Sequence, residues 1–291
     1  MEQELSKIKK LTISAVFLSM ALVMKYFSFD LPLFGASGIR VGFAEIFTVF
    51  PALLFGPFYG AVVAGLNDVL GHLIKPMGAY MPLITATAIL GGFMRGYFWR
   101  IMRNISCKKL RIFLLVIALT ALIVGIYNMY ALKLDGVHSS VYEETNDIDT
   151  DGFRYISSLL IKGSMTRSNP TGILTGYIIV TTWALIAFGI LCLLFIAVDI
   201  LLAKYNAART VYSTQILATM LIAGITVNSL NTVILREFLF PAWKLLPFTA
   251  LWLPRLSEVI LISCINSFFV ALLYPLCLTR GRTSDIECEK L

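Results

Sequence analysis

Asp68 and His72 are the residues of this chain whose types and spacing most directly indicate chemistry. They stand four positions apart in an apolar stretch, so a helix would carry both on one face. Such a pair can relay protons, supply half of a metal site, or satisfy itself by mutual hydrogen bonding. Because an ionisable group in apolar surroundings is costly, an embedded one is a candidate functional residue. Asn67 directly precedes Asp68 and enlarges this polar group.

Further polar residues interrupt the apolar C-terminal part of the chain. Asn228 and Asn231 are three positions apart and would share a helix face, where they can bind a ligand or form interhelical hydrogen bonds. Arg255 directly follows Pro254, and we expect it to open the last helix, beside the positive end of the helix dipole. Glu258 lies one turn later, so Arg255 can either pair with that carboxylate or bind an anionic ligand.

The elements that must position these residues are membrane helices. Of all residues, 58% are hydrophobic and 14% are charged, and the mean hydropathy is +0.82. So apolar a chain requires lipid, where only helices or closed barrels satisfy the backbone polar groups. We therefore predict an all-α integral membrane protein with about eight spanning helices. The predicted spans are residues 11–28, 43–55, 58–74, 81–102, 112–132, 172–203, 211–235 and 253–278.

The distribution of Lys and Arg predicts the topology. In short loops these residues gather on the cytoplasmic side, as they do here if both termini are cytoplasmic. Membrane orientation then explains the net charge of +7, and we predict no nucleic-acid partner. Four cations nevertheless fall near the outer face, which indicates either an anionic ligand arriving from outside or phospholipid head groups. They are Arg40, Lys75, Arg236 and Arg255.

Several chemistries lack the residues that they need. The chain has no nucleotide-binding glycine loop, no nucleophile elbow and only two histidines, so we predict no enzyme activity of its own. Its five cysteines are scattered singly, which supports neither a zinc site nor a disulfide framework. Residues 147–152 copy the first half of a calcium-binding loop, but Ser158 stands where the bidentate Glu is needed. We predict no metal and no cofactor, and calcium stays open only for that segment.

Ala15 and Ser19 on the first predicted helix are small residues four positions apart. Small residues at this spacing allow a second helix to approach closely. This face is therefore a candidate contact for another membrane protein.

Several short sequence motifs occur in the same order and at the same topological positions as in one known family. They are LPLFG (31–35) with IR (39–40), LFGPFYG (54–60), GLNDVLG (65–71), PMGAYMP (76–82), NSLNT (228–232) and LPR (253–255). In these motifs the chain resembles the substrate-binding S components of energy-coupling-factor (ECF) vitamin transporters, especially their folate-type branch. The resemblance extends over two blocks, residues 1–103 and 209–280.

The resemblance implies a six-helix core with cytoplasmic termini and a first outer loop that covers a vitamin. It also implies that a separate membrane scaffold and two ATPase subunits supply the transport energy, so that ATP is used only by the partners. Ala15 and Ser19 would dock on the scaffold. The substrate-binding candidates are Arg40, Asn67, Asp68, Tyr80, Asn228, Asn231 and Arg255.

The chain departs from this family between the fourth and fifth core helices. Residues 104–208 insert two further predicted helices, joined by an acidic outer loop at 133–171. The core then comprises four helices in residues 1–103 and two in 209–280, followed by a cytoplasmic tail at 281–291. Because an insertion of two helices preserves the orientation of the helices after it, the core topology can be kept.

Our leading hypothesis is a vitamin-binding subunit of an ECF-type uptake transporter in the bacterial cytoplasmic membrane. The resemblance to the folate-type branch makes folate or a related pterin the first choice of ligand. The chemistry is consistent with it, since Asp68 or the Asn pair can meet the pterin edge and Arg40 or Arg255 can bind carboxylates. One alternative is a secondary transporter that uses Asp68 and His72 for proton coupling. The other is a membrane enzyme or a scaffold without a small ligand.

Cysteine labelling in intact cells tests the predicted topology. Ser139→Cys, in the outer loop, should react with a membrane-impermeant maleimide before the membrane is opened. Ser284→Cys, in the tail, should react only after permeabilisation. Modification of Ser139→Cys only in permeabilised cells would contradict the assignment.

Overall fold

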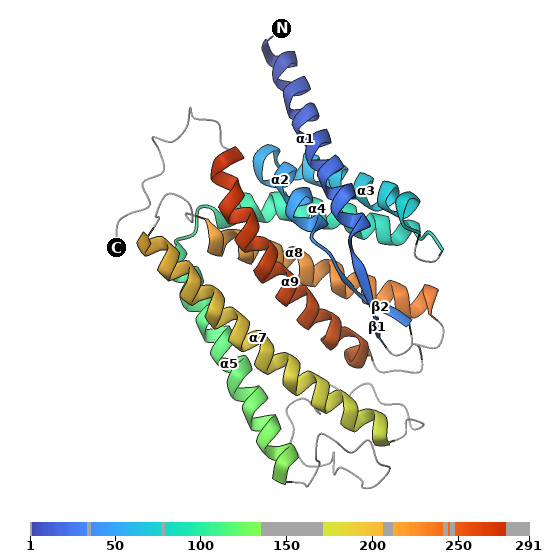
Figure 1. Ribbon diagram of the computed structural model, residues 1–291, viewed down its shortest axis with the longest axis vertical. Helices are drawn as coiled ribbons and strands as arrows, with labels where there is room; N and C mark the ends of the chain where they lie inside the picture. Colours follow the sequence, from blue (N-terminus) through green and yellow to red (C-terminus); the bar gives the residue numbers. More distant parts are fainter. Residues whose placement is uncertain are drawn as a thin grey trace. The chain divides into compact units, whose positions relative to one another are not determined.

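The computed structural model describes residues 2–33, 36–76, 79–134, 171–205, 212–240, 244 and 248–277. Within them lie eight α-helices, at the positions where the sequence predicts apolar spans (Figure 1). They are α1 (Glu2–Tyr26), α2 (Ala44–Phe55), α3 (Pro57–Ile74), α4 (Pro82–Met102), α5 (Cys107–Leu134), α7 (Thr171–Tyr205), α8 (Ser213–Ile234) and α9 (Phe248–Cys277). A short π-helix, η1 (Leu235–Leu239), follows α8. The prediction of a helical protein is confirmed.

The segment between α1 and α2 is not helical. Strands β1 (Phe29–Leu33) and β2 (Ala36–Val41) form an antiparallel hairpin. The register of the ladder shifts between Leu31 and Pro32, where proline has no N–H to donate. The sequence analysis expected only a loop here, so the hairpin is an addition to the predicted helices.

The predicted break between the second and third helices is confirmed at Gly56 and Pro57. α2 ends at Phe55 and α3 begins at Pro57. Gly56 has a φ of 99°, a left-handed conformation that glycine adopts without strain. Pro57 suits the first helical position, because an N–H there would have no partner within the helix. The Arg100 guanidinium lies so close that a Cβ on Gly56 would meet it at 2.7 Å.

The chain folds as two compact units. The first comprises Met1–Arg111, Phe195–Val227 and Ile262–Leu291, and the second comprises Ile112–Leu194 and Asn228–Leu261. All but two of the polar contacts used below to build the candidate site lie within the first unit.

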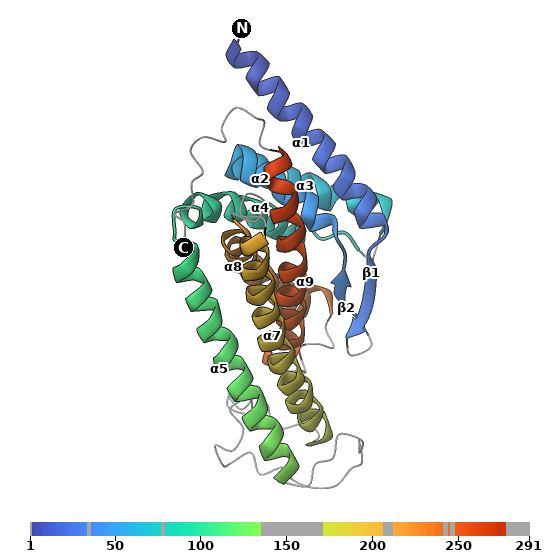
Figure 2. The ribbon, with the colours of Figure 1, turned by 60° about the vertical axis from the view of Figure 1, so that its left-hand side comes forward.

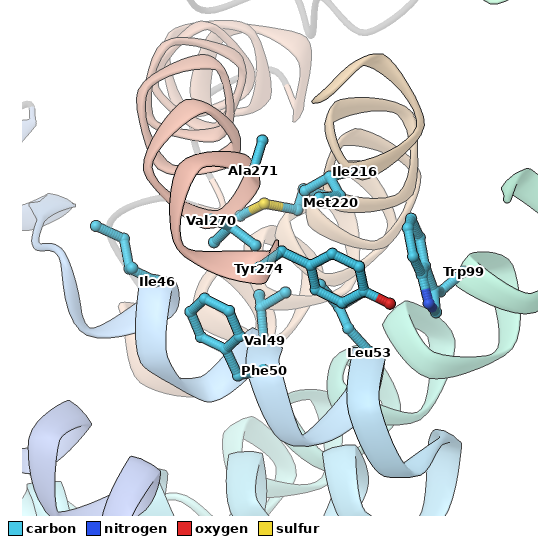
Figure 3. Packing of buried hydrophobic residues seen from close by; sticks show 10 residues of the cluster. All are labelled: Ile46, Val49, Phe50, Leu53, Trp99, Ile216, Met220, Val270, Ala271 and Tyr274. Atoms are coloured by element: carbon cyan, nitrogen blue, oxygen red, sulfur yellow. The ribbon is translucent and has the colours of Figure 1, made fainter. Parts of the chain in front are cut away.

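An apolar core holds the first unit together. Its ten buried residues come from α2, α4, α8 and α9, and Figure 3 shows the Tyr274 ring directed at Trp99. Trp99 meets Tyr212 and Tyr274 edge-on, with ring centroids 5.4 and 5.5 Å apart, an arrangement in which aromatic rings attract each other. Phe17 of α1 stacks on Phe50 of α2 at 4.9 Å, which attaches the first helix to this core.

α3 and α4 approach each other through glycines. A Cβ on Gly92 would lie 2.2 Å from the carbonyl oxygen of Gly60, and one on Gly60 would lie 2.5 Å from that of Gly92. Small residues at a helix contact permit such close backbones. The contact holds α4 near enough for its Thr85 to reach Asp68 of α3.

In the second unit, α5 and α7 lie side by side (Figures 1 and 2). Gly125 of α5 packs against Ile186, and Gly189 of α7 packs against Leu122, each at a distance that leaves no room for a Cβ. The two helices that the sequence analysis predicts on either side of the acidic loop are therefore present as a packed pair.

Two helical stretches of the described residues are long and apolar enough to cross a membrane, Cys107–Tyr130 and Ser213–Leu239. Shorter apolar stretches occupy Ala44–Phe55, Leu185–Leu201 and Glu258–Tyr274. The multi-pass topology stays a prediction. Residues 135–170 of the predicted outer loop, including the calcium-like segment 147–152 and Ser139, and the tail at 281–291 with Ser284, lie outside the described residues.

Candidate functional site

Asp68 lies on α3 beside Lys25, which comes from the end of α1. The Lys25 ammonium is 3.7 Å from Asp68 Oδ1 and donates hydrogen bonds to the backbone carbonyls of Asn67, at 3.0 Å, and Asp68, at 3.5 Å. The Lys25 side chain is only 11% exposed, so water screens the pair weakly. Asp68 therefore has a compensating cation that the sequence analysis did not identify.

A chain of hydroxyl groups begins at the other Asp68 oxygen. Thr85 Oγ1 donates to Asp68 Oδ2 at 2.8 Å, and the Tyr80 hydroxyl lies 2.9 Å from Thr85 Oγ1. Since threonine has one hydroxyl proton and Asp68 receives it, Tyr80 must be the donor to Thr85. The Tyr80 oxygen then keeps lone pairs that can accept a hydrogen bond from a ligand. Tyr80 is exposed and Thr85 is buried, so the chain leads from the surface to the carboxylate.

His72 is not a hydrogen-bonding partner of Asp68 within the described residues. Its ring packs against that of Tyr80, with centroids 5.3 Å apart and the planes tilted by 54°. The described partners of Asp68 are Lys25 and Thr85. The mutual pair that the four-residue spacing suggested is therefore replaced by contacts from other segments, and His72 supports the Tyr80 ring instead.

The base of the hairpin is anchored close to this group. Lys75 Nζ donates a hydrogen bond to the backbone carbonyl of Ser28, directly before β1. Lys75 is therefore engaged by the backbone. Arg40 pairs with Asp30 across the ladder of β1 and β2, and its side chain lies outside the described part of the structure. Asn67 Oδ1 is buried and has no partner among the described residues.

Within the second unit, two further predicted site residues, Asn228 and Arg255, are in contact. Arg255 is 8% exposed, and its Nε donates to Asn228 Oδ1 at 3.3 Å. Glu258 adds an electrostatic attraction to Arg255. Within the described residues, Arg255 Nη1 and Asn228 Nδ2 are buried and have no hydrogen-bond partner. Asn231, three residues after Asn228 on α8, is half-buried.

The prediction that Arg255 opens the last helix is wrong. α9 begins at Phe248, so Arg255 lies seven residues into the helix and Pro254 lies inside it. The apolar residues before Pro254 continue the helix, so the proline does not mark its start. The positive end of the helix dipole is confined to the first turn and therefore does not act at Arg255.

The predicted site residues thus meet in two groups, one within each unit. Asp68 and Tyr80 belong to one hydrogen-bonded chain, with Asn67 adjacent, and Asn228 is bonded to Arg255. The roles of these residues in binding stay predictions. Two embedded ion pairs were missed altogether.

The missed pairs are also in the first unit. Arg95 donates to Glu45, and Asn266 Nδ2 donates to Glu45 Oε2 at 3.2 Å. Arg111 Nε donates to Asp199 Oδ2 at 2.7 Å. Glu45, Arg95 and Asp199 all fall inside predicted apolar spans, and that position alone marks an ionisable residue as a candidate. The signal was therefore present in the sequence.

Protein groups occupy both oxygens of the Asp199 carboxylate. Besides Arg111, it accepts from Ser213 and from Thr214, the latter at 3.0 Å, and it is 3% exposed. Ser213 begins α8, and the first turn of a helix favours a carboxylate. This cluster ties α5, α7 and α8 together and has a structural role. No group of three or more His, Cys, Asp or Glu side chains in the described part of the chain can hold a metal ion.

Comparisons with known proteins show similarity to components of transporters. Residues 5–145 match the family described as "ECF-type riboflavin transporter, S component". The curated protein "Folate transporter FolT" of Clostridium novyi (strain NT) is 37% identical over 71 residues, which are 24% of this chain and 41% of that protein. The chain thus spans about two fifths of the length of this relative. No solved structure matches. The matched family is one of transporter components, in agreement with the expectation of a non-enzyme.

Thr85→Val should lower the stability of the protein, because it removes the hydroxyl between Tyr80 and Asp68 but keeps the side-chain shape. Leaving the carboxylate and the phenol without this partner should cost about 1–3 kcal/mol, measured as a lower unfolding temperature of the purified chain without ligand. The matched control is Thr120→Val, which removes an exposed hydroxyl bonded to Ile117 of its own helix. Equal shifts for the two variants would contradict a stabilising role of the hydroxyl chain.

Proposed function

We propose that this chain, whose residues 5–145 match the S-component family of ECF riboflavin transporters, is the vitamin-binding membrane subunit of a bacterial uptake transporter. The observation that carries the proposal is the hydrogen-bonded chain from Tyr80 through Thr85 to Asp68 beside Lys25. A polar group of this kind is costly among apolar helices, and recognition of a polar ligand is a reason to keep it. ATP hydrolysis then takes place on partner subunits.

Folate or a related pterin is the first candidate ligand, and riboflavin is the second. The curated relative is named for folate and the matched family for riboflavin. Both vitamins join a fused heteroaromatic ring to a polar tail. Tyr80 and Asp68 present acceptors and so suit N–H or O–H donors of such a ligand. Arg255 belongs to the second unit and is not part of this group; its Nη1, buried and unpaired among the described residues, keeps it a predicted anion-binding residue in its own right.

The proton-coupled alternative gains no support from the geometry. It depends on a relay between Asp68 and His72, whereas the described contacts of His72 are with Tyr80. The carboxylate instead has Lys25 beside it, which suits a fixed binding group.

Binding of folate and of riboflavin to the purified full chain tests the proposal. Asp68→Asn removes the charge at the end of the hydroxyl chain and should lower the affinity for the vitamin about tenfold or more. Glu237→Gln changes a carboxylate that is 44% exposed and should leave the affinity unchanged. A wild-type chain that binds neither vitamin would contradict the proposal.

We also propose that one face of α1 docks on a membrane scaffold that works with two ATPase subunits. Ser14 and Ala21 are buried and Phe17 packs inward, whereas Ala15 and Ser19 are exposed. The two small residues therefore point away from the described contacts of α1. A partner helix can approach closely at such a face.

Ala15→Trp and Ser19→Trp should block uptake by cells that contain the complete transporter but leave vitamin binding by the purified chain nearly unchanged. Bulk at this face keeps a partner helix at a distance without touching the bound vitamin. Leu272→Trp, at an exposed position of α9, adds similar bulk elsewhere and should leave uptake intact. Equal losses of binding and uptake in the α1 variants would place this face in the ligand site or the core.

A further inference from the structure

Glu45, Arg95 and Asn266 form a polar group within the first unit, here named the inner cluster. Arg95 Nη2 donates to Glu45 Oε1, and Asn266 Nδ2 donates to Glu45 Oε2 at 3.2 Å. The three residues lie on α2, α4 and α9, so a single carboxylate connects three helices that are distant in sequence.

The inner cluster is enclosed and carries no net charge. Asn266 is 0% exposed, and the side chains of Arg95 and Glu45 are 13% and 23% exposed. Arg95 compensates Glu45, which also lies in the first turn of α2, where the helix dipole favours a carboxylate. The arrangement therefore holds its polar groups in fixed positions at low electrostatic cost.

Two atoms of the inner cluster have no partner among the described residues. They are the donor Arg95 Nε and the acceptor Asn266 Oδ1, and both are buried. Buried polar atoms are nearly always hydrogen-bonded, so an unpaired one requires an explanation. Both groups bond to the same carboxylate, so the open donor and the open acceptor belong to one cluster.

We propose that Arg95 Nε and Asn266 Oδ1 receive the lactam edge of the vitamin ring, with Glu45 as the positioning residue. A lactam edge is an N–H beside a C=O: the N–H donates to Asn266, and the C=O accepts from Arg95. The rings of folate and riboflavin both carry this edge. The inference rests on the proposed function and names the part of the ligand that the inner cluster binds.

The spacing along α4 fits this assignment. Thr85 and Arg95 are ten residues apart on one helix, a rise of about 15 Å. A ligand with its ring at the inner cluster can therefore extend a polar tail toward Thr85 and Asp68. Asp68 and Tyr80 then accept from donors of the tail, and the pterin edge, which the sequence analysis placed at Asp68 or the Asn pair, lies at Asn266.

Pairs of ligands that differ only at this edge test the inference on the purified full chain. Aminopterin differs from folate in replacing the ring C=O by an amino group, and 3-methylriboflavin replaces the ring N–H of riboflavin by N–CH₃. Whichever vitamin the wild type binds, its edge-altered analogue should bind at least tenfold more weakly.

Two variants locate this preference. Asn266→Leu removes the acceptor, and Arg95→Lys keeps a cation beside Glu45 but removes the Nε donor. Each variant should lower the affinity for the vitamin about tenfold. Each should also abolish most of the difference in affinity between the vitamin and its analogue. Asn128→Leu makes the same change at another fully buried asparagine, on α5, and should keep both the affinity and the preference.

The outcomes separate this inference from the proposed function. A wild type that binds a vitamin without discriminating against its analogue would overturn the lactam assignment and leave the proposed function standing. Full preference retained in Asn266→Leu and Arg95→Lys would also overturn it, since the open atoms would then serve water or the fold. A wild type that binds neither vitamin would overturn both.

Discussion

A charge inside an apolar helix bundle needs a partner of opposite sign, and this requirement organises the first unit. An isolated charge removed from water costs several kcal/mol, whereas a compensated and hydrogen-bonded pair can persist. Three embedded carboxylates in the described part of this unit each have a basic partner. The pairs are Asp68 with Lys25, Glu45 with Arg95, and Asp199 with Arg111. Because the partners in each pair come from different helices, the pairs also fix which helices are neighbours.

The three pairs differ in whether hydrogen-bonding atoms remain for a ligand. This difference distinguishes structural from functional pairs. Hydroxyls and a guanidinium occupy both oxygens of Asp199, so nothing remains for a ligand. Asp68 connects through Thr85 to an exposed tyrosine. Glu45 holds Arg95 and Asn266, each of which has one buried polar atom, Nε and Oδ1, that is unpaired among the described residues. We therefore propose a binding function for the last two pairs only.

Hydropathy predicted the helices because lipid and core impose the same apolar composition on long segments. The span expected at 58–74 is α3, Pro57–Ile74, and the break before it has the predicted glycine and proline. Prediction from the sequence fails where a local pattern competes with a contact between residues that are distant in sequence. The spacing of Asp68 and His72 suggested a partner on the same helix, but the cation comes from Lys25, 43 residues earlier. No local rule could predict that pairing.

Other differences have identifiable physical causes. The hairpin between α1 and α2 was missed although Phe29, Leu31 and Leu33 are apolar at alternate positions, because each strand has only five or six residues and contains a proline or a glycine. Arg255 was assigned to a helix start because Pro254 resembles a helix boundary, yet the apolar residues before it extend α9. Glu45 and Arg95 could have been found by their position within apolar spans, although their mutual contact could not.

Mass spectrometry of small molecules released from the purified full chain tests the central claim, that this protein holds a vitamin, most directly. Cells expressing the protein would be grown with both folate and riboflavin, because a tight binder retains its ligand through purification. The account predicts one dominant released species, a folate or pterin or else riboflavin, in an amount close to one molecule per chain. A folded chain that releases neither, and takes up neither when they are added back, would contradict the account.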